Sequence, residues 1–342
     1  MQEVQANRAV LSVPDRALRD QLQARRQRLR EALPRVQKPE RLAELLQQVD
    51  AALESMDAGT FGLCETCHDP IESDRLLANP LCRHCLDHLS PTEQRALERD
   101  LALAFQVQRG LLPQATCAVD GWSVAYHYEP AGSVSGDYCD LIPLEDDTAL
   151  FLIGDITGKG IAASMLMAHL HAIFRSLTIT RQPVADLVSG ANRVFSQGIS
   201  SSHFATLACG SLGHGGVVDI CNAGHCRPLH VSRHGVATID GTGVPLGILP
   251  DWEYTSHRLC LEAGDSLVLY TDGLSEAFNA GNQQYGAARL AKLLQQHGTL
   301  ASKDLLGAIL EDLKAFRSRH SPADDLTIMV IRRVGVDGAA HA

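Results

Sequence analysis

Seven short apolar runs after Trp122 constrain the fold of this chain more than any other feature. They read WSVAYHY, ALFLIGDI, FATLACGSL, VVDICNAG, HRLCL, SLVLYT and LTIMVIRR. Patterns with helical spacing alternate with them, at residues 161–177, 184–199, 286–297 and 303–317. Many strands with segregated helices indicate an α+β or a layered α/β domain.

Composition narrows the class of protein further. The 342 residues are 45% hydrophobic, enough for a large core, and the net charge of −10 argues against a mainly nucleic-acid-binding protein. No run of about 18 apolar residues is present, and the first residues lack a signal-peptide core. We therefore expect a cytoplasmic protein without membrane or direct DNA contact, whose cysteines are reduced or metal-bound.

Residues 1–59 form an N-terminal helical segment in this interpretation. Leucines at helical spacing predict one helix over Asp15–Leu33 and a second over Glu40–Met56, with Gly59 ending the second. Nine Lys and Arg stand against three acidic residues between Arg8 and Lys38. This basic arm is either a solvated helix face or a contact for an acidic partner.

Residues 60–89 contain two C-x2-C pairs separated by fourteen residues. Four thiolates in two close pairs suit a tetrahedral structural zinc ion. Because so short a segment can bury only a small hydrophobic core, one bound Zn²⁺ would supply most of its folding energy. His68, His84 and His88 are expected bystanders, and the predicted ligands are Cys64, Cys67, Cys82 and Cys85.

Residues 90–113 are predicted to be a linker helix. Ser90 is a plausible N-cap with Glu93 three residues later, and Leu97, Leu101 and Phe105 follow at helical spacing. The apolar face of a solitary helix needs a partner, either the next domain or a second chain.

Aspartates follow or precede several of the apolar runs. Converging carboxylates repel one another unless they are protonated or bound to cations. Hard oxygen ligands favour Mg²⁺ or Mn²⁺, and a pair of such ions can promote phosphoryl displacement. The acids in question are Asp137, Asp140, Asp155, Asp272, Asp324 and Asp325.

The glycine-rich turn after Ile153 is not a nucleotide loop. Three residues rather than four separate Gly154 from Gly158, and Gly160 rather than Ser or Thr follows Lys159. The candidate functional residue of this turn is therefore Asp155 rather than Lys159. Lys159 either attracts phosphate or is a solvated side chain.

The segment DAALESMDAGTFGLCETCHDPIESDRLLANPLCRHC resembles the DksA/TraR zinc finger. In that family the finger sits on a helical hairpin that enters the secondary channel of RNA polymerase. Here the spacer is short, and the turn LPRVQKPE lacks the acidic tip of the family. The finger fold and zinc are therefore carried over, whereas RNA polymerase contact is only an alternative.

The motifs GDYCD, IGDITGKGIAASMLMA, FATL, NAGHCRPL, GVPLGI, LVLYTDGLSEAFN and DDLTIMVIR resemble the SpoIIE-type branch of the metal-dependent (PPM) serine/threonine phosphatases over residues 105–333. The resemblance implies an α+β fold: an αββα sandwich of two antiparallel sheets flanked by helices, over residues 114–334. It also implies two Mn²⁺ or Mg²⁺ ions at one edge. Residues 335–342 are an expected disordered tail.

By motif position, Asp155 would bridge both ions with help from the backbone carbonyl of Ile156. Asp272 and Asp324 would hold one ion and Asp137 the other. Asp325 is the less certain member of its pair, and Asp140 would act through water. The catalytic set implied by the resemblance is Asp137, Asp155, Asp272 and Asp324.

Three residues leave alternatives open. Cys139 stands where the family is expected to have a larger or aromatic residue, and its thiol is either inert or sensitive to oxidation. Asn222 and His225 belong to the family pattern, either as a structural turn or as catalytic groups.

The resemblance implies hydrolysis of phosphoserine or phosphothreonine, without a covalent enzyme intermediate. The usual substrate in this family is a phosphorylated anti-sigma-factor antagonist. We expect a homodimer through the linker helix, regulated by the N-terminal module. The alternatives are a catalytically weak scaffold and a transcription regulator that contacts RNA polymerase through the finger.

Overall fold

The computed structural model describes residues 13–35, 39–72, 75–76, 79–113, 116–119, 121–180, 182–199, 203–241, 243–317 and 324–335. The chain divides into two compact units, residues 1–99 and 100–342, each described here by itself. The hairpin turn at 36–38 and the tail at 336–342 lie outside the described residues, so the predictions made for them remain predictions.

The first unit contains the two predicted helices. They are α1 (Val13–Ala32), followed by a short η1 turn (Leu33–Arg35), and α2 (Glu40–Ala58). Arg19 pairs with Asp57 at 2.6 Å, and Arg26 lies 3.7 Å from Asp50, so α2 neutralises part of the basic arm within the chain. The helices bury one shared apolar cluster: Leu18, Leu22, Val49, Leu53 and Met56.

Helix α4 (Pro91–Leu111) lies in the segment predicted to be a linker helix, and the division between the units falls within it. The Ser90 hydroxyl donates to Glu93 Oε2 at 2.6 Å, and the Glu93 N–H donates back to Ser90 Oγ at 3.3 Å. Glu93 Oε2 also accepts the Ser90 N–H at 3.0 Å, so this reciprocal cap satisfies two backbone donors that have no partner inside the helix.

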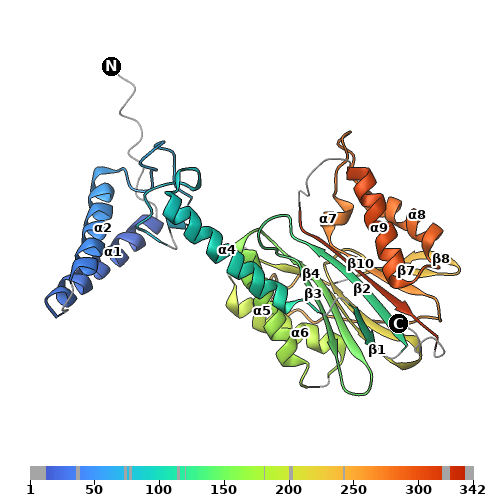
Figure 1. The fold of residues 1–342 in the computed structure, drawn as a ribbon. Coiled ribbons are helices and arrows are strands. Elements are labelled where there is room, and N and C mark those ends of the chain that lie inside the picture. The colour runs from blue at the N-terminus through green and yellow to red at the C-terminus, as the bar shows by residue number, and fades with distance from the viewer. Residues whose placement is uncertain are drawn as a thin grey trace. The chain divides into compact units, whose positions relative to one another are not determined.

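The second unit is built on two antiparallel sheets (Figure 1). One has the order β1-β2-β11-β10-β7-β8 and the other β3-β4-β5-β6-β9. The strands of the first are β1 (Thr116–Val119), β2 (Trp122–Glu129), β11 (Leu326–Arg333), β10 (Ser266–Tyr270), β7 (Leu229–Ser232) and β8 (Gly235–Thr238). Those of the second are β3 (Tyr138–Pro143), β4 (Ala149–Ile156), β5 (Ala205–Leu212), β6 (Val217–Ala223) and β9 (His257–Cys260).

Helices cover the outer face of each sheet, which confirms the predicted α+β sandwich (Figure 1). Helices α5 (Ile161–Leu177) and α6 (Val184–Gly198) pack on the five-stranded sheet. Helices α8 (Gly286–His297) and α9 (Ser302–Arg317), with the short α7 (Asp272–Ser275), pack on the six-stranded sheet. Among the described residues, no helix is both long and apolar enough to cross a membrane.

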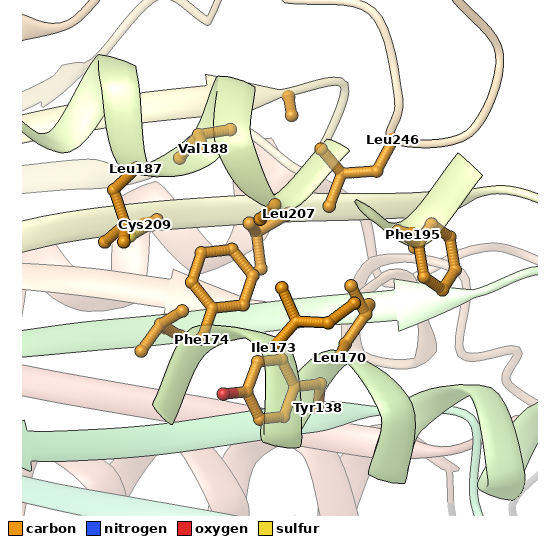
Figure 2. Close-up of a cluster of buried hydrophobic side chains, with 14 of the residues drawn as sticks. Tyr138, Leu170, Ile173, Phe174, Leu187, Val188, Phe195, Leu207, Cys209 and Leu246 are labelled. Atoms are coloured by element: carbon orange, nitrogen blue, oxygen red, sulfur yellow. The ribbon is translucent and has the colours of Figure 1, made fainter. Parts of the chain in front are cut away.

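Strand β4 explains why these layers form. Its side chains alternate, so Leu150 and Leu152 face the helices while Phe151 and Ile153 enter the core between the sheets. Both faces are thus buried, which accounts for its unbroken apolar run. Figure 2 shows the helix-covered side, where Phe174 of α5 and Phe195 of α6 pack among side chains from the sheet.

Candidate metal centres

Strand pairing brings the predicted acids to one edge of the sandwich. Tyr138 at the start of β3 pairs with Gly154 near the end of β4, so Asp137 and Asp155 lie at the same edge of one sheet. In the other sheet Tyr270 pairs with Ile328, so Asp272 follows β10 where the loop containing Asp324 enters β11. Sequence analysis identified these acids, but only antiparallel pairing shows that they share an edge.

One carboxylate links the two sheets at this edge. Thr271 and Thr327 donate their hydroxyls to Asp137 Oδ2 at 3.0 and 2.5 Å. Asp137 is 1% exposed, and burial, followed by the charge of Asp155, raises the pKa of its carboxyl well above the usual range. Neither threonine was predicted from the sequence, although each stands one or two residues from a predicted ligand.

The remaining acids are close enough to repel one another. Burial, then the charges of Asp272, Asp324 and Asp325, raises the pKa of Asp155 to about 7. Burial and the charge of Asp324 likewise raise the pKa of Asp272. Clustered oxygen donors of this kind suit Mg²⁺ or Mn²⁺, which would relieve the repulsion.

Gly136 shows how the loop before β3 meets the end of β4. A β-carbon at this position would lie 3.0 Å from the carbonyl oxygen of Ile156 and 3.5 Å from Asp155 Oδ1. Both oxygens therefore face the loop that carries Asp137. This placement fits the predicted pairing of the Asp155 carboxylate with the Ile156 carbonyl.

Asp325 has a backbone partner on each oxygen of its carboxylate. Its Oδ1 accepts the N–H of Ala131 at 2.7 Å, and its Oδ2 accepts the N–H of Gly136 at 2.9 Å. Both carboxylate oxygens thus hold the loop before β3. Asp324 is half-exposed; its Oδ1 lies 3.0 Å from Lys159 Nζ and accepts the N–H of Asp325 at 3.0 Å.

A close backbone contact keeps Asp272 beside this pair. A β-carbon on Gly273 would lie only 1.9 Å from the carbonyl oxygen of Asp325, so no larger residue fits without a shift of backbone. The glycine after Asp272 therefore allows the start of α7 to pack directly on the loop that enters β11.

Asp140 lies elsewhere, contrary to the prediction that it acts on the metals through water. Arg175 of α5 donates to both of its oxygens, at 2.9 and 2.7 Å. His171 Nε2 lies 3.6 Å away. Asp140 points toward the helix layer because side chains alternate along β3, so it contributes to packing rather than to the acidic edge.

The structure favours the structural alternative for the remaining motif residues. Cys139 is buried between the sheets, and burial raises the pKa of its thiol well above the usual range, so the thiol stays protonated. Asn222 Oδ1 accepts the N–H of His225 at 2.7 Å, and its amide donates back to the His225 carbonyl at 3.1 Å. These bonds close a turn, and burial lowers the pKa of His225 to about 4.

Gln108 of α4 is a contact that sequence analysis did not predict. It is 4% exposed; its Nε2 donates to the Ser135 carbonyl at 2.6 Å, and its Oε1 accepts the Ser135 N–H at 3.0 Å. Ser135 Oγ in turn accepts the N–H of Asp137 at 3.0 Å. The linker helix therefore contacts the backbone that positions a predicted metal ligand. In the sequence, the only sign of this contact is that Gln108 is a polar residue within the helical apolar pattern of α4.

The cysteine-rich segment assembles a second candidate centre, with one difference from the prediction. Among the described residues, the ligand atoms of Cys64, Cys67, Cys85 and His88 lie within 4.8 Å of one another. Cys82 is not in this group; its Sγ lies 4.0 Å from Arg75 Nη2.

The donor chemistry of this group fits zinc. Burial raises the pKa of Cys64, but hydrogen bonds from the backbone of Cys67 and Cys85 outweigh it and bring the pKa to about 6. A backbone hydrogen bond from Asp69 lowers the pKa of Cys67, but burial and hydrogen bonds with the Cys64 and Cys85 thiols outweigh it and bring that pKa to about 12. Cys64 is therefore available as the thiolate that zinc requires, whereas a bound ion would have to displace the proton of Cys67.

Two family profiles match the chain, and both agree with the resemblances seen in the sequence. The profile of Stage II sporulation protein E (SpoIIE) matches residues 145–334, and that of the prokaryotic dksA/traR C4-type zinc finger matches residues 59–87. Asp137 and His88 each lie outside the matched segments.

Similar proteins support the same assignment. Protein IcfG of Synechocystis sp. is 26% identical over 68% of this chain and 41% of its own length. Phosphoserine phosphatase RsbU of Bacillus subtilis is 26% identical over 70% of this chain and 72% of its own length. The SiaA-PP2C domain of Pseudomonas aeruginosa superposes with a TM-score of 0.63 at 19% identity, covering 71% of this chain and 99% of that domain. That likeness concerns the fold alone. The chain spans less than half of IcfG.

Proposed function

Because the chain belongs to the SpoIIE family, we propose that it is a metal-dependent phosphatase acting on phosphoserine or phosphothreonine in proteins. The observation that carries this proposal is the meeting of Asp137, Asp155, Asp272 and Asp324 at one edge of the sandwich. The similarity to phosphoserine phosphatase RsbU adds support.

Each acid has a distinct part in this proposal. Two Mn²⁺ or Mg²⁺ ions, when bound, would activate water and withdraw charge from the phosphoryl group. Asp155 and the Ile156 carbonyl would hold both ions, and Asp272 and Asp324 one of them. Asp137 would offer Oδ1 to the other ion, because two threonine hydroxyls already donate to its Oδ2.

The remaining groups at the edge support these ligands. Asp325 fixes the loop that carries Asp137, through two backbone N–H groups. Lys159 places a positive charge beside Asp324, where it offsets part of the repulsion among the acids.

We infer that the substrate is a phosphorylated anti-sigma-factor antagonist, the usual substrate in the family. The direct test is phosphate release from such a protein by the purified chain with Mn²⁺ or Mg²⁺. Asp155→Asn should abolish turnover, whereas Asp147→Asn, in the β3–β4 turn at the opposite end of these strands, should leave it unchanged. Undiminished turnover in Asp155→Asn would refute the assignment of the site.

We also propose that the chain forms a homodimer through α4 and that the N-terminal unit regulates it. Leu103 and Val107 are 61% and 56% exposed and lie one turn apart on this helix. The variant carrying Leu103→Glu and Val107→Glu should have the mass of one chain in light scattering, where the unchanged protein has the mass of two. A monomeric unchanged protein would exclude this mode of pairing.

A further inference from the structure

We propose that the fourth zinc ligand of the finger is Nδ1 of His88, and that Cys82 is not a ligand. The finger would then hold zinc with three thiolates and one imidazole. Such a set is a closed, tetrahedral structural site. The inference concerns the finger alone and does not depend on the proposed phosphatase activity.

The backbone after Cys85 explains why His88 reaches this position. Residues Leu86–His88 form a 3-10 turn, η2, in which the His88 N–H donates to the Cys85 carbonyl at 3.0 Å. Side chains three residues apart in such a turn lie on the same side. Cys85 Sγ and His88 Nδ1 are accordingly 3.2 Å apart.

The spacing of the sulfur atoms suits one shared ion. Cys67 Sγ and Cys85 Sγ lie 3.7 Å apart. Two thiolates bound tetrahedrally at about 2.3 Å from zinc are separated by roughly 3.8 Å. The pair therefore already has the edge length of a zinc tetrahedron.

Neighbouring charges hold the turn that presents His88. Glu72 Oε1 accepts the N–H of Leu86 at 3.1 Å, and Glu72 Oε2 accepts from Arg75 Nη1 at 3.2 Å. Arg75 Nη1 also donates to the His84 carbonyl at 2.9 Å. These bonds fix the chain on both sides of Cys85, while Cys82 Sγ is directed to Arg75 Nη2.

Charge also favours this ligand set. Three thiolates and a neutral imidazole around Zn²⁺ carry a net charge of about −1, against −2 for four thiolates. Cys64 and Cys85 are both buried, so the site with the smaller net charge loses less hydration.

X-ray absorption at the zinc edge tests the proposal on the full chain with one equivalent of zinc. Excess Mg²⁺ should occupy the acidic edge, because carboxylates suit Mg²⁺ whereas thiolates select zinc. We expect three sulfur atoms at about 2.3 Å and one nitrogen at about 2.0–2.1 Å. Four sulfur atoms in the unchanged protein would overturn the proposal.

Single variants identify the nitrogen and exclude the remaining sulfur. Cys82→Ser should retain three sulfur atoms, one nitrogen and one equivalent of zinc. His88→Ala should lose the outer-shell scattering of the imidazole ring, whether water or Cys82 takes its place. The matched control His84→Ala should leave the spectrum unchanged. An imidazole signal that persists in His88→Ala, or a sulfur lost in Cys82→Ser, would contradict the assignment.

Discussion

The adjacent pair Asp324 and Asp325 shows how two identical side chains acquire different roles. Asp325 accepts two backbone N–H groups, whereas Asp324 is half-exposed beside Lys159. Asp324 Oδ1 also accepts a backbone N–H, that of Asp325 at 3.0 Å, but only Asp325 binds the loop at 131–136, and the motif alone does not reveal this difference. For this reason the sequence left the choice open.

Exchanging each of these acids for its amide should separate the two roles. Asp325→Asn should lower the free energy of unfolding by about 1.5–3 kcal/mol, because a charged acceptor of a backbone N–H is lost. Asp324→Asn should lower that free energy by less, because weaker repulsion among the acids offsets the loss of its charged bond to the Asp325 N–H. It should weaken Mn²⁺ binding by at least about tenfold, as even outer partners of metal ligands matter that much. Denaturant unfolding measures the change in stability, and calorimetric titration measures the affinity for Mn²⁺. A larger loss of stability in Asp324→Asn together with a larger loss of Mn²⁺ affinity in Asp325→Asn would contradict these roles.

The raised pKa of Asp155 predicts a pH dependence of metal binding. Its carboxyl has a pKa of about 7 in the folded protein without metal, against an ordinary value of 3.8. The folded state therefore holds more protons than the unfolded chain between about pH 4 and pH 7, and the contribution of Asp155 to stability falls as pH rises through that range. Mn²⁺ must displace this proton, so its affinity should rise with pH up to about 7.

Calorimetry in buffers of different ionisation enthalpy measures the protons released. Mn²⁺ binding should release more protons at pH 6 than at pH 8. Equal release at both values would show that no acid of the site titrates in this range.

At the scale of elements, α4 connects most directly to the acidic edge. Gln108→Leu should leave the backbone N–H and C=O of Ser135 without their partner and destabilise the second unit by about 2–4 kcal/mol. Mn²⁺ affinity should fall as well, because Ser135 positions Asp137. The control Gln106→Leu, at an exposed position of the same helix, should change stability by less than about 0.5 kcal/mol. Equal effects of the two variants would show that Gln108 has no special role.

The sequence predicted some elements well and others not at all. Each of the four helices expected after residue 160 is present within one or two residues, because its apolar spacing matches the face that it buries. Strand β3 escaped detection because Asp140 interrupts its apolar pattern. Arg175, thirty-five residues away, neutralises that aspartate, and no local pattern reveals such a pairing. Strands β1, β7 and β8 were also missed; each has only four residues, which give a weak periodic signal, whereas the run that predicted the equally short β9 continues to Leu261.

At the scale of the whole molecule, two units with separate cores should unfold separately. The N-terminal unit has a small core, and zinc would supply much of its stability. Cys64→Ser should therefore lower or abolish one thermal transition and leave the other in place. Differential scanning calorimetry with Mg²⁺ present measures both transitions. A single transition that shifts as a whole would show that the two units unfold together.

The bond from Thr271 and Thr327 to Asp137 has a consequence for the order of folding. Neither sheet alone contains all the proposed metal ligands, so ions can bind only after the two sheets have docked. Interactions that form after the rate-limiting step slow unfolding and leave the folding rate unchanged. Metal binding at this edge would thus lengthen the lifetime of the native state without shortening the time needed to reach it.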